Sequence, residues 1–184
     1  MNWNEFSWAC FLFHAWYSTD AYAELMTNQR YTELIVAPQL SDEEGRYAAE
    51  RIVWFLGKYG CHTPNQPAVI DALAQALHNS WERLAGLAEL EIEGIDFNHN
   101  VRGTEQTFAE VVTNLYETFV AVSHIGPTSI GKLLCILRPK LFVMWDKGIR
   151  ERYGVVESKN GYCRFLGLME DLTQEVKLNE CIDS

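Results

Sequence analysis

The stretch from His124 to Gly154, HIGPTSIGKLLCILRPKLFVMWDKGIRERYG, combines a glycine turn, a helix start, a cluster of basic residues and one aspartate. Gly126 has no Cβ, so it can adopt the positive φ of a tight turn between two helices. Pro127 suits the first position of the next helix, because its missing N–H would have no partner there in any case. That helix should end near Leu137, since the residue before a proline, here Arg138, favours an extended conformation.

Two features of this stretch suit a phosphate and a catalytic acid. The backbone N–H groups of Thr128 and Ser129 should project from the helix N-terminus, where the positive end of the helix dipole attracts anions. Asp146 can cap the following helix, KGIRERYG, by accepting a backbone N–H. It can also be a partly desolvated catalytic carboxylate beside Trp145. The two interpretations of Asp146 are compatible.

The order of these residues resembles the helix-hairpin-helix DNA glycosylase superfamily. The shared pattern is an apolar residue, a glycine, any two residues and a serine, then an apolar helix, a proline and an aspartate 20 residues after the glycine. In that superfamily the hairpin grips the phosphate backbone and the aspartate is catalytic. The resemblance covers 31 residues and implies that Gly126 is the second hairpin glycine and Asp146 the catalytic acid.

The chain departs from the superfamily at several positions. His124 replaces the first hairpin glycine, and Pro127 removes one N–H from the turn. Thr128 stands where bifunctional members keep the lysine that forms a Schiff base, so the resemblance implies a monofunctional enzyme. The four-cysteine iron–sulfur loop of some members is missing, because the cysteines are widely spaced, at Cys10, Cys61, Cys135, Cys163 and Cys181. We therefore expect neither a metal nor another cofactor.

The expected site follows from the resemblance and from the basic cluster. Asp146 would be the catalytic residue, and Trp145 and Tyr153 would line the pocket for the base. The residues expected to contact nucleic acid are His124, Gly126, Thr128, Ser129, Lys132, Lys147 and Arg150.

The net charge of −10 argues against a generic nucleic-acid-binding protein, because Lys and Arg supply most of the affinity for phosphate. The distribution of charge changes this view. Six of the 15 basic residues lie between positions 132 and 152, where Asp146 and Glu151 are the only acids, so this segment is +4 and the remainder is −14. Such a positive footprint suits a few phosphate contacts, and it equally suits the solvated face of a helix.

Apolar residues at helical spacing predict an all-α fold: a helical bundle of two small lobes with a helix-hairpin-helix motif near 108–138. The 184 residues would form a single compact helical domain, with a lobe boundary near 89–103 if there are two lobes. The expected helices cover part or all of 3–26, 42–59 behind a capping box of Ser41 and Glu44, 67–87, a segment from a Thr104 cap to Val122, and 162–176. The run YTELIV before Pro38 fits either a strand or a helix end.

The segment 89–103 changes to acidic and then to Asn- and Gly-rich composition, which is typical of a loop. Its polar residues could contact a ligand or could simply turn the chain; they are Asp96, Asn98, His99 and Asn100.

Two hypotheses for function follow. The first is a monofunctional glycosylase that binds duplex DNA, including damaged duplexes, in the cytoplasm. No membrane segment is predicted, and the cysteines resemble reduced thiols of an intracellular protein. The second is a non-catalytic helical module that binds nucleic acid or a protein partner through an acidic surface. A third interpretation is that the spacing from Gly126 to Asp146 arises by chance in an ordinary helical bundle.

Overall fold

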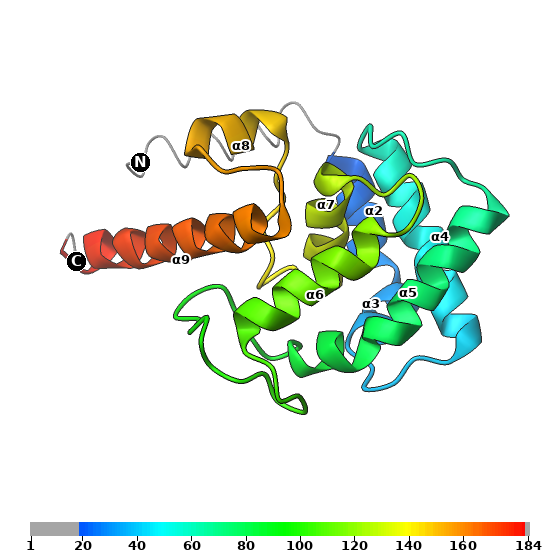
Figure 1. The fold of residues 1–184 in the computed structure, drawn as a ribbon, viewed down its shortest axis with the longest axis horizontal. Helices are drawn as coiled ribbons and strands as arrows, with labels where there is room; N and C mark the ends of the chain where they lie inside the picture. Colours follow the sequence, from blue (N-terminus) through cyan, green and yellow to red (C-terminus); the bar gives the residue numbers. More distant parts are fainter. Residues whose placement is uncertain (1–18, 183–184) are drawn as a thin grey trace.

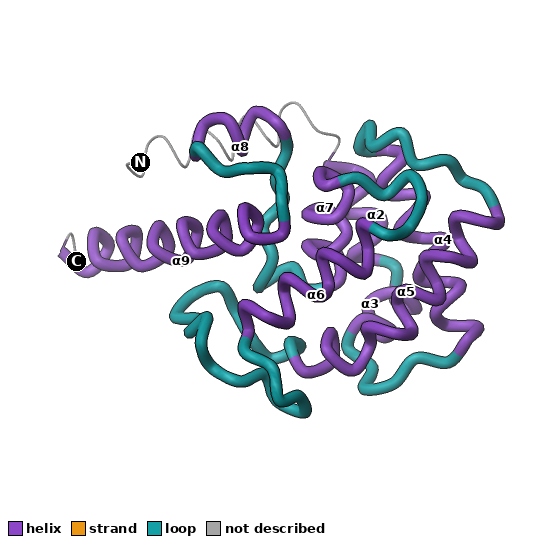
Figure 2. The backbone as a smooth tube through the Cα atoms, viewed as in Figure 1, coloured by secondary structure: helices purple, strands orange, loops and turns teal. Residues whose placement is uncertain are grey.

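The computed structural model describes residues 19–182, in which the chain forms eight helices and no strand (Figures 1 and 2). A single isolated β-bridge in this range joins Asn100 and Thr107. The all-α prediction is confirmed. The aromatic residues expected to form a helix over positions 3–18 lie outside the described range. The helices are α2 (Thr19–Thr27), α3 (Gln29–Ile35), α4 (Asp42–Lys58), α5 (Pro67–Gly86), α6 (Phe108–Val120), α7 (Pro127–Leu137), α8 (Lys147–Tyr153) and α9 (Lys159–Ile182).

Capping boxes start two of these helices. At α4 the Glu44 N–H donates to Ser41 Oγ at 3.3 Å, and the Ser41 N–H donates to the Glu44 carboxylate at 2.9 Å, as predicted. The start of α6 differs from the expectation, because its cap is Thr107 and not Thr104. Thr107 has a glutamate three residues later, Glu110, which completes a second capping box. Thr104 instead donates its hydroxyl to the Val101 carbonyl at 3.0 Å within the preceding loop.

The run YTELIV, which fitted either a strand or a helix end, is the end of α3: Tyr31 to Ile35 are helical and Val36 is the C-cap. Asn28 caps this helix by accepting the Tyr31 N–H at 3.0 Å. Tyr31 is fully buried, and its hydroxyl donates to the Ile136 carbonyl in α7 at 3.3 Å. This segment is therefore helical although it contains β-branched residues, and its buried tyrosine ring packs against a helix that is distant in the sequence.

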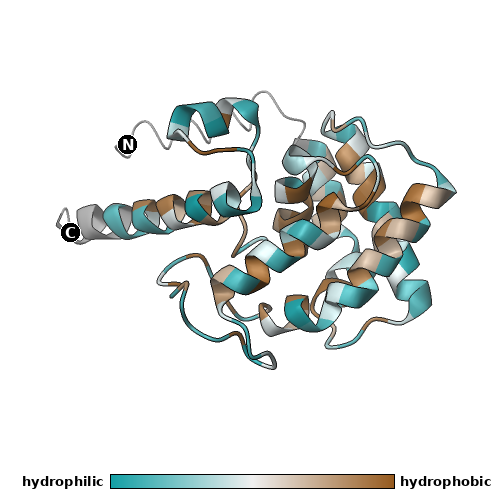
Figure 3. Cartoon of the chain, viewed as in Figure 1, coloured by the Kyte–Doolittle hydropathy of each residue, from teal (hydrophilic) through white to brown (hydrophobic). Residues whose placement is uncertain are grey.

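Helix α7 lies at the centre of the molecule, with α4 and α6 packed against it (Figure 1). Eight of its 11 residues are buried, including the apolar residues Ile130, Leu133, Leu134, Ile136 and Leu137. Hydrophobic residues are frequent in α7 and rare in α8 (Figure 3). Helix α9 packs on α6, and its far end extends away from the body formed by the other helices (Figure 1).

The order α6, turn, α7 gives the helical hairpin that the sequence predicted near 108–138. Helix α7 begins at Pro127 and ends at Leu137, as expected from the two prolines of this segment.

No helix among residues 19–182 is long and apolar enough to cross a lipid bilayer.

Candidate functional site

The turn between α6 and α7 uses a different residue for its left-handed conformation than the sequence suggested. Gly126 is extended, with φ −89° and ψ 174°, and is the N-cap of α7. The positive φ, 66°, belongs to His124. Histidine is among the residues that tolerate this region best. The His124 carbonyl accepts the Thr63 hydroxyl at 3.3 Å, which ties the turn to the loop before α5.

The first turn of α7 has no side-chain cap. Gly126 provides no side chain to cap the helix, and the first intrahelical hydrogen bond runs from the Ile130 N–H to the Gly126 carbonyl at 3.0 Å. The N–H groups of Thr128 and Ser129 precede that bond, so neither has a carbonyl partner within the helix. Thr128 is half-buried and Ser129 is buried. This geometry suits an anion at the start of α7.

Asp146 is the N-cap of α8. Its Oδ1 accepts the Ile149 N–H at 2.8 Å, and its side chain is half-buried. The capping interpretation of this residue is thereby confirmed. The hydrogen bond fixes the direction of the carboxylate, because one oxygen is held against the first turn of the helix.

Two hydrogen bonds connect the surroundings of Asp146 to the start of α7. The indole N–H of Trp145 donates to the Pro127 carbonyl at 2.9 Å. The Arg150 guanidinium donates to Thr128 Oγ1 at 3.1 Å. The fold therefore brings together the turn and the aspartate, which are separated by 20 residues in the sequence.

Trp145, which was expected to line a base pocket, packs in the interior beside the start of α7. The side chain is fully buried, with ring centroids of Tyr162 and Phe165 at 4.8 and 5.9 Å. A Cβ on Gly131 would lie 2.6 Å from Trp145 Cδ1, so the indole touches the backbone of α7. Tyr153, the other expected wall, is half-buried and packs edge-on against Phe165 at 5.8 Å.

Arg150 is also more buried than a phosphate-binding side chain would be, with 7% of its surface exposed. It lies over the Trp145 ring, 5.2 Å from the centroid, and forms an ion pair with Glu157. The sequence reasoning missed Glu157, which the left-handed Gly154 turns back toward α8.

The buried hydroxyl of Tyr116 has no hydrogen-bond partner. Burial, and then the negative charge of Glu157, raise the pKa of this phenol.

The predicted basic footprint is only partly at the surface. Lys132 and Arg138 are 4% and 5% exposed. The Lys132 ammonium donates to the Tyr59 carbonyl at 3.0 Å, and Arg138 Nε donates to the Leu84 carbonyl at 2.8 Å. With Arg150, three of the six clustered cations are therefore interior, because their polar ends find carbonyl, hydroxyl or carboxylate partners there.

The remaining cations of the cluster are exposed, and two of them face carboxylates. Lys147, an expected DNA contact, lies 3.7 Å from Glu151. Lys140 lies 2.6 Å from Glu91, and this contact raises the pKa of the lysine. Solvent screens such exposed pairs, so Lys147 remains available to a phosphate at low cost.

Two cavities lie away from Asp146 and Trp145. One, of about 990 Å³, is formed by the end of α5, the following loop and the start of α6. The other, of about 670 Å³, lies between α6 and α9. Of the polar loop residues considered as ligand contacts, Asp96, His99 and Asn100 line the first cavity, whereas Asn98 lines neither.

Across the part of the chain that the structure describes, no group of three or more His, Cys, Asp or Glu side chains is arranged to hold a metal ion. Comparison of the chain with protein families, with curated proteins and with solved structures finds no match.

Proposed function

We propose that this chain binds DNA through the α6–α7 turn and acts as a monofunctional glycosylase, with Asp146 as its catalytic carboxylate. The observation that carries the proposal is the position of Asp146 beside the start of α7. Trp145 contacts the Pro127 carbonyl and Arg150 contacts Thr128, so the residues on both sides of the carboxylate are attached to the hairpin.

The chemistry requires few groups. Breaking an N-glycosidic bond develops positive charge on the sugar, and a carboxylate held at that point stabilises the charge or activates water. The first turn of α7 would hold a backbone phosphate next to the reacting nucleotide, since its N–H groups lack a side-chain cap. The target base would first have to leave the stack.

The test is Asp146→Asn. Asparagine caps helices as well as aspartate does, so this variant keeps the hydrogen bond to Ile149 while removing the charge. We expect the wild type to release a base from at least one duplex in a panel that carries single damaged or mismatched bases. The variant should release none while binding the same duplex with unchanged affinity. Abasic sites are detected by alkaline cleavage of the labelled strand.

Asp96→Asn is the matched control for this experiment. Asp96 likewise accepts a backbone N–H, from Asn98 at 2.9 Å, but it lies in the loop before α6. The control should keep full activity. Full activity in Asp146→Asn would remove Asp146 from the chemistry.

A second candidate function is a non-catalytic helical module that binds nucleic acid or a protein partner through an acidic surface. The burial of Lys132, Arg138 and Arg150 favours it, because the surface of a chain with net charge −10 then presents even fewer cations. Salt distinguishes the two candidates. Affinity for DNA through phosphate contacts must fall steeply as salt is added, whereas absence of DNA binding at low salt would favour a protein partner.

A further inference from the structure

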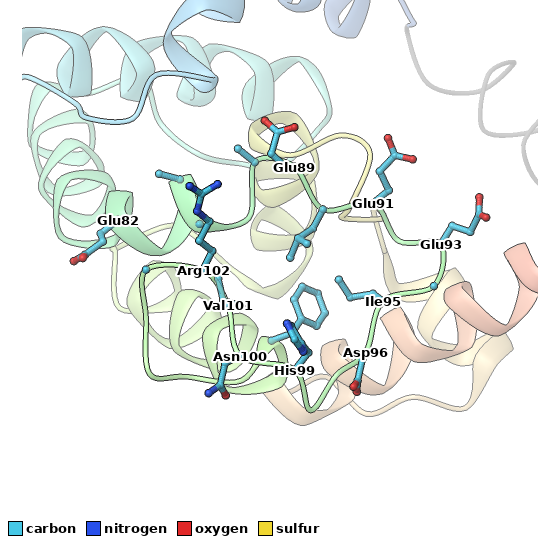
Figure 4. Close-up of a pocket in the computed structure, with 17 residues that line it drawn as sticks. Glu82, Glu89, Glu91, Glu93, Ile95, Asp96, His99, Asn100, Val101 and Arg102 are labelled. Atoms are coloured by element: carbon cyan, nitrogen blue, oxygen red, sulfur yellow. The ribbon is translucent and has the colours of Figure 1, made fainter.

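We propose that the cavity between α5 and α6 binds a basic segment of a partner protein, in which one apolar side chain is flanked by lysine or arginine. We call this cavity the α5–α6 groove; it is lined by residues of the last turn of α5, of the loop 88–103, and by Phe108 at the start of α6 (Figure 4). Its volume is about 990 Å³. This is the upper end of the range for small-molecule pockets and is ample for several side chains.

The walls of the groove are fixed by backbone contacts. A Cβ on Gly86 would lie 2.4 Å from the Arg102 carbonyl oxygen, so the loop lies directly against the backbone of α5. The Phe108 N–H donates to the His99 carbonyl, and the Val101 N–H donates to the Gln106 carbonyl, both at 2.9 Å. These contacts tie residues 99–102 of the loop to the end of α5 and to the start of α6. A binding partner therefore meets a surface that is already formed, which lowers the entropy cost of association.

The floor of the groove is apolar. Phe108 and Val101 are buried, with 1% and 3% of their surfaces exposed, and Leu90 and Ile95 are half-buried. The Phe108 ring also packs edge-to-face with the Phe97 ring, with centroids 5.1 Å apart. An apolar side chain placed in the groove would bury the exposed parts of Leu90 and Ile95, and burial of apolar surface is the main source of affinity in such an anchor.

The rim of the groove is strongly negative. Arg102 is the one lysine or arginine among the lining residues, so the formal charge of the lining is −4 with His99 neutral. Lys140 approaches Glu91 from outside the groove at 2.6 Å and offsets one of the charges. The rim carboxylates, all exposed and spread around the opening (Figure 4), are Glu82, Glu89, Glu91, Glu93 and Asp96.

An apolar floor inside a negative rim complements a peptide better than a simple cation. Lysine and arginine side chains can reach separate carboxylates around the rim, while an apolar side chain between them fills the floor. A linear polyamine would satisfy the rim and leave the floor without a partner. The groove would bind the protein partner of the second candidate function, the non-catalytic module. This proposal therefore rests on that function and not on glycosylase activity. It lies at the opposite end of α6 from the proposed DNA-contacting turn, about 20 Å away.

The test measures fluorescence anisotropy of a labelled peptide with a central leucine flanked by lysine and arginine. Glu89→Gln/Glu93→Gln should weaken its binding about fivefold, since each exposed charge pair contributes modestly. The matched control is Glu24→Gln/Glu105→Gln, which removes the same charge from two exposed residues outside the groove. Glu105 belongs to the connection between α5 and α6, so this control also tests the loop. Equal loss in the two double variants would mean general charge attraction and would overturn the proposal.

A second variant tests the groove itself without changing charge. Ala88 is exposed and lines the opening, so Ala88→Trp should obstruct the groove and weaken peptide binding about tenfold while leaving the fold intact. Replacing the central leucine of the peptide with serine should have a similar effect. If spermine binds as tightly as the peptide, and the leucine makes no difference, the site takes a small polycation and the proposal fails.

The outcome is separable from that of the DNA proposal. Asp146→Asn should leave peptide affinity unchanged, and Ala88→Trp should leave DNA affinity unchanged. If the wild type binds no basic peptide at low salt, the groove proposal is overturned whatever the result with DNA.

Discussion

Asp146 has a structural role as the N-cap of α8, and the same hydrogen bond would serve the proposed chemistry. Its Oδ1 accepts the Ile149 N–H at 2.8 Å, which orients the carboxyl group through the backbone of α8. The preceding residue, Trp145, is locked by its hydrogen bond to Pro127 and by its contact with Gly131. Under the proposed function, a carboxylate held in this way would need little further ordering when a substrate binds.

Gly131 is the residue that allows this arrangement. We expect Gly131→Ala to destabilise the fold by about 1–3 kcal/mol, because its Cβ would lie 2.6 Å from Trp145 Cδ1 and 3.3 Å from the Trp145 backbone nitrogen. Urea denaturation followed by circular dichroism measures the change.

The helical glycine Gly57 provides the control, because nothing lies within 4 Å of a Cβ at that position. Gly57→Ala in α4 should be neutral or should stabilise the fold by up to about 1 kcal/mol. Equal stability of Gly131→Ala and the wild type would show that Trp145 can move away from α7 without cost.

At the scale of the helices, the two capping boxes give the fold a dependence on pH. Hydrogen bonds from the Ser41 hydroxyl and N–H lower the pKa of Glu44, and hydrogen bonds from the Thr107 N–H and hydroxyl lower that of Glu110. Each carboxylate is therefore more acidic when folded than when unfolded. Its contribution to stability is fully present above the ordinary value of 4.5 and is lost as the pH falls through the lower folded value.

We therefore expect Thr107→Ala to destabilise the fold by about 1 kcal/mol at neutral pH, because the first turn of α6 loses its cap. The difference from the wild type should shrink in acid, where Glu110 is protonated and the box is already weakened. Urea denaturation at pH values above and below 4.5 tests this. Thr104→Ala is the control: Thr104 is not the cap, so its effect should lack this dependence on pH. A pH-independent effect of Thr107→Ala would contradict the account.

Most helix boundaries could be predicted because their signals are local. Ser41 with Glu44 marks the start of α4, and Pro127 marks the start of α7. The cap of α6 was misassigned although the same signal, a threonine followed three residues later by Glu110, was present. The left-handed residue of the turn was also misassigned, since composition favours Gly126 and the geometry uses His124. The backbone there depends on how two helices pack, which no short window of sequence contains.

Across the whole molecule, the distribution of charge was the property least accessible to sequence analysis. The basic residues between 132 and 152 predict one basic surface patch. In the folded chain, however, Lys132, Arg138 and Arg150 are buried. Several partners of these side chains lie far away along the chain: Lys132 donates to Tyr59, 73 positions earlier, and Arg138 donates to Leu84, 54 positions earlier. The α5–α6 groove was equally hidden, because its lining comes from two helices and a loop whose arms meet only after folding.

Arg138 joins three parts of the structure. Its guanidinium donates to the carbonyls of Leu84 at the end of α5, Ile35 at the end of α3 and Leu137 in α7. Arg138→Met should lower the free energy of unfolding by about 3 kcal/mol or more, because it leaves these buried carbonyls without donors. Urea denaturation provides the measurement.

The control is Arg164→Met, which removes the same side chain from an exposed position on α9 and should change stability little. A similarly small effect of Arg138→Met would show that water or a neighbouring group replaces the guanidinium.

The central position of α7 has a consequence for amide hydrogen exchange. Residues of α7 contact Tyr31 and Tyr59, and its C-cap Arg138 contacts Leu84. These three partners belong to separate segments earlier in the chain. α7 therefore cannot expose its backbone without releasing several other helices, so its amides exchange with deuterium only when the whole core opens. The slowest protons of this one helix thus report the stability of the entire fold. They should slow further when a ligand binds to the native state, wherever that ligand sits.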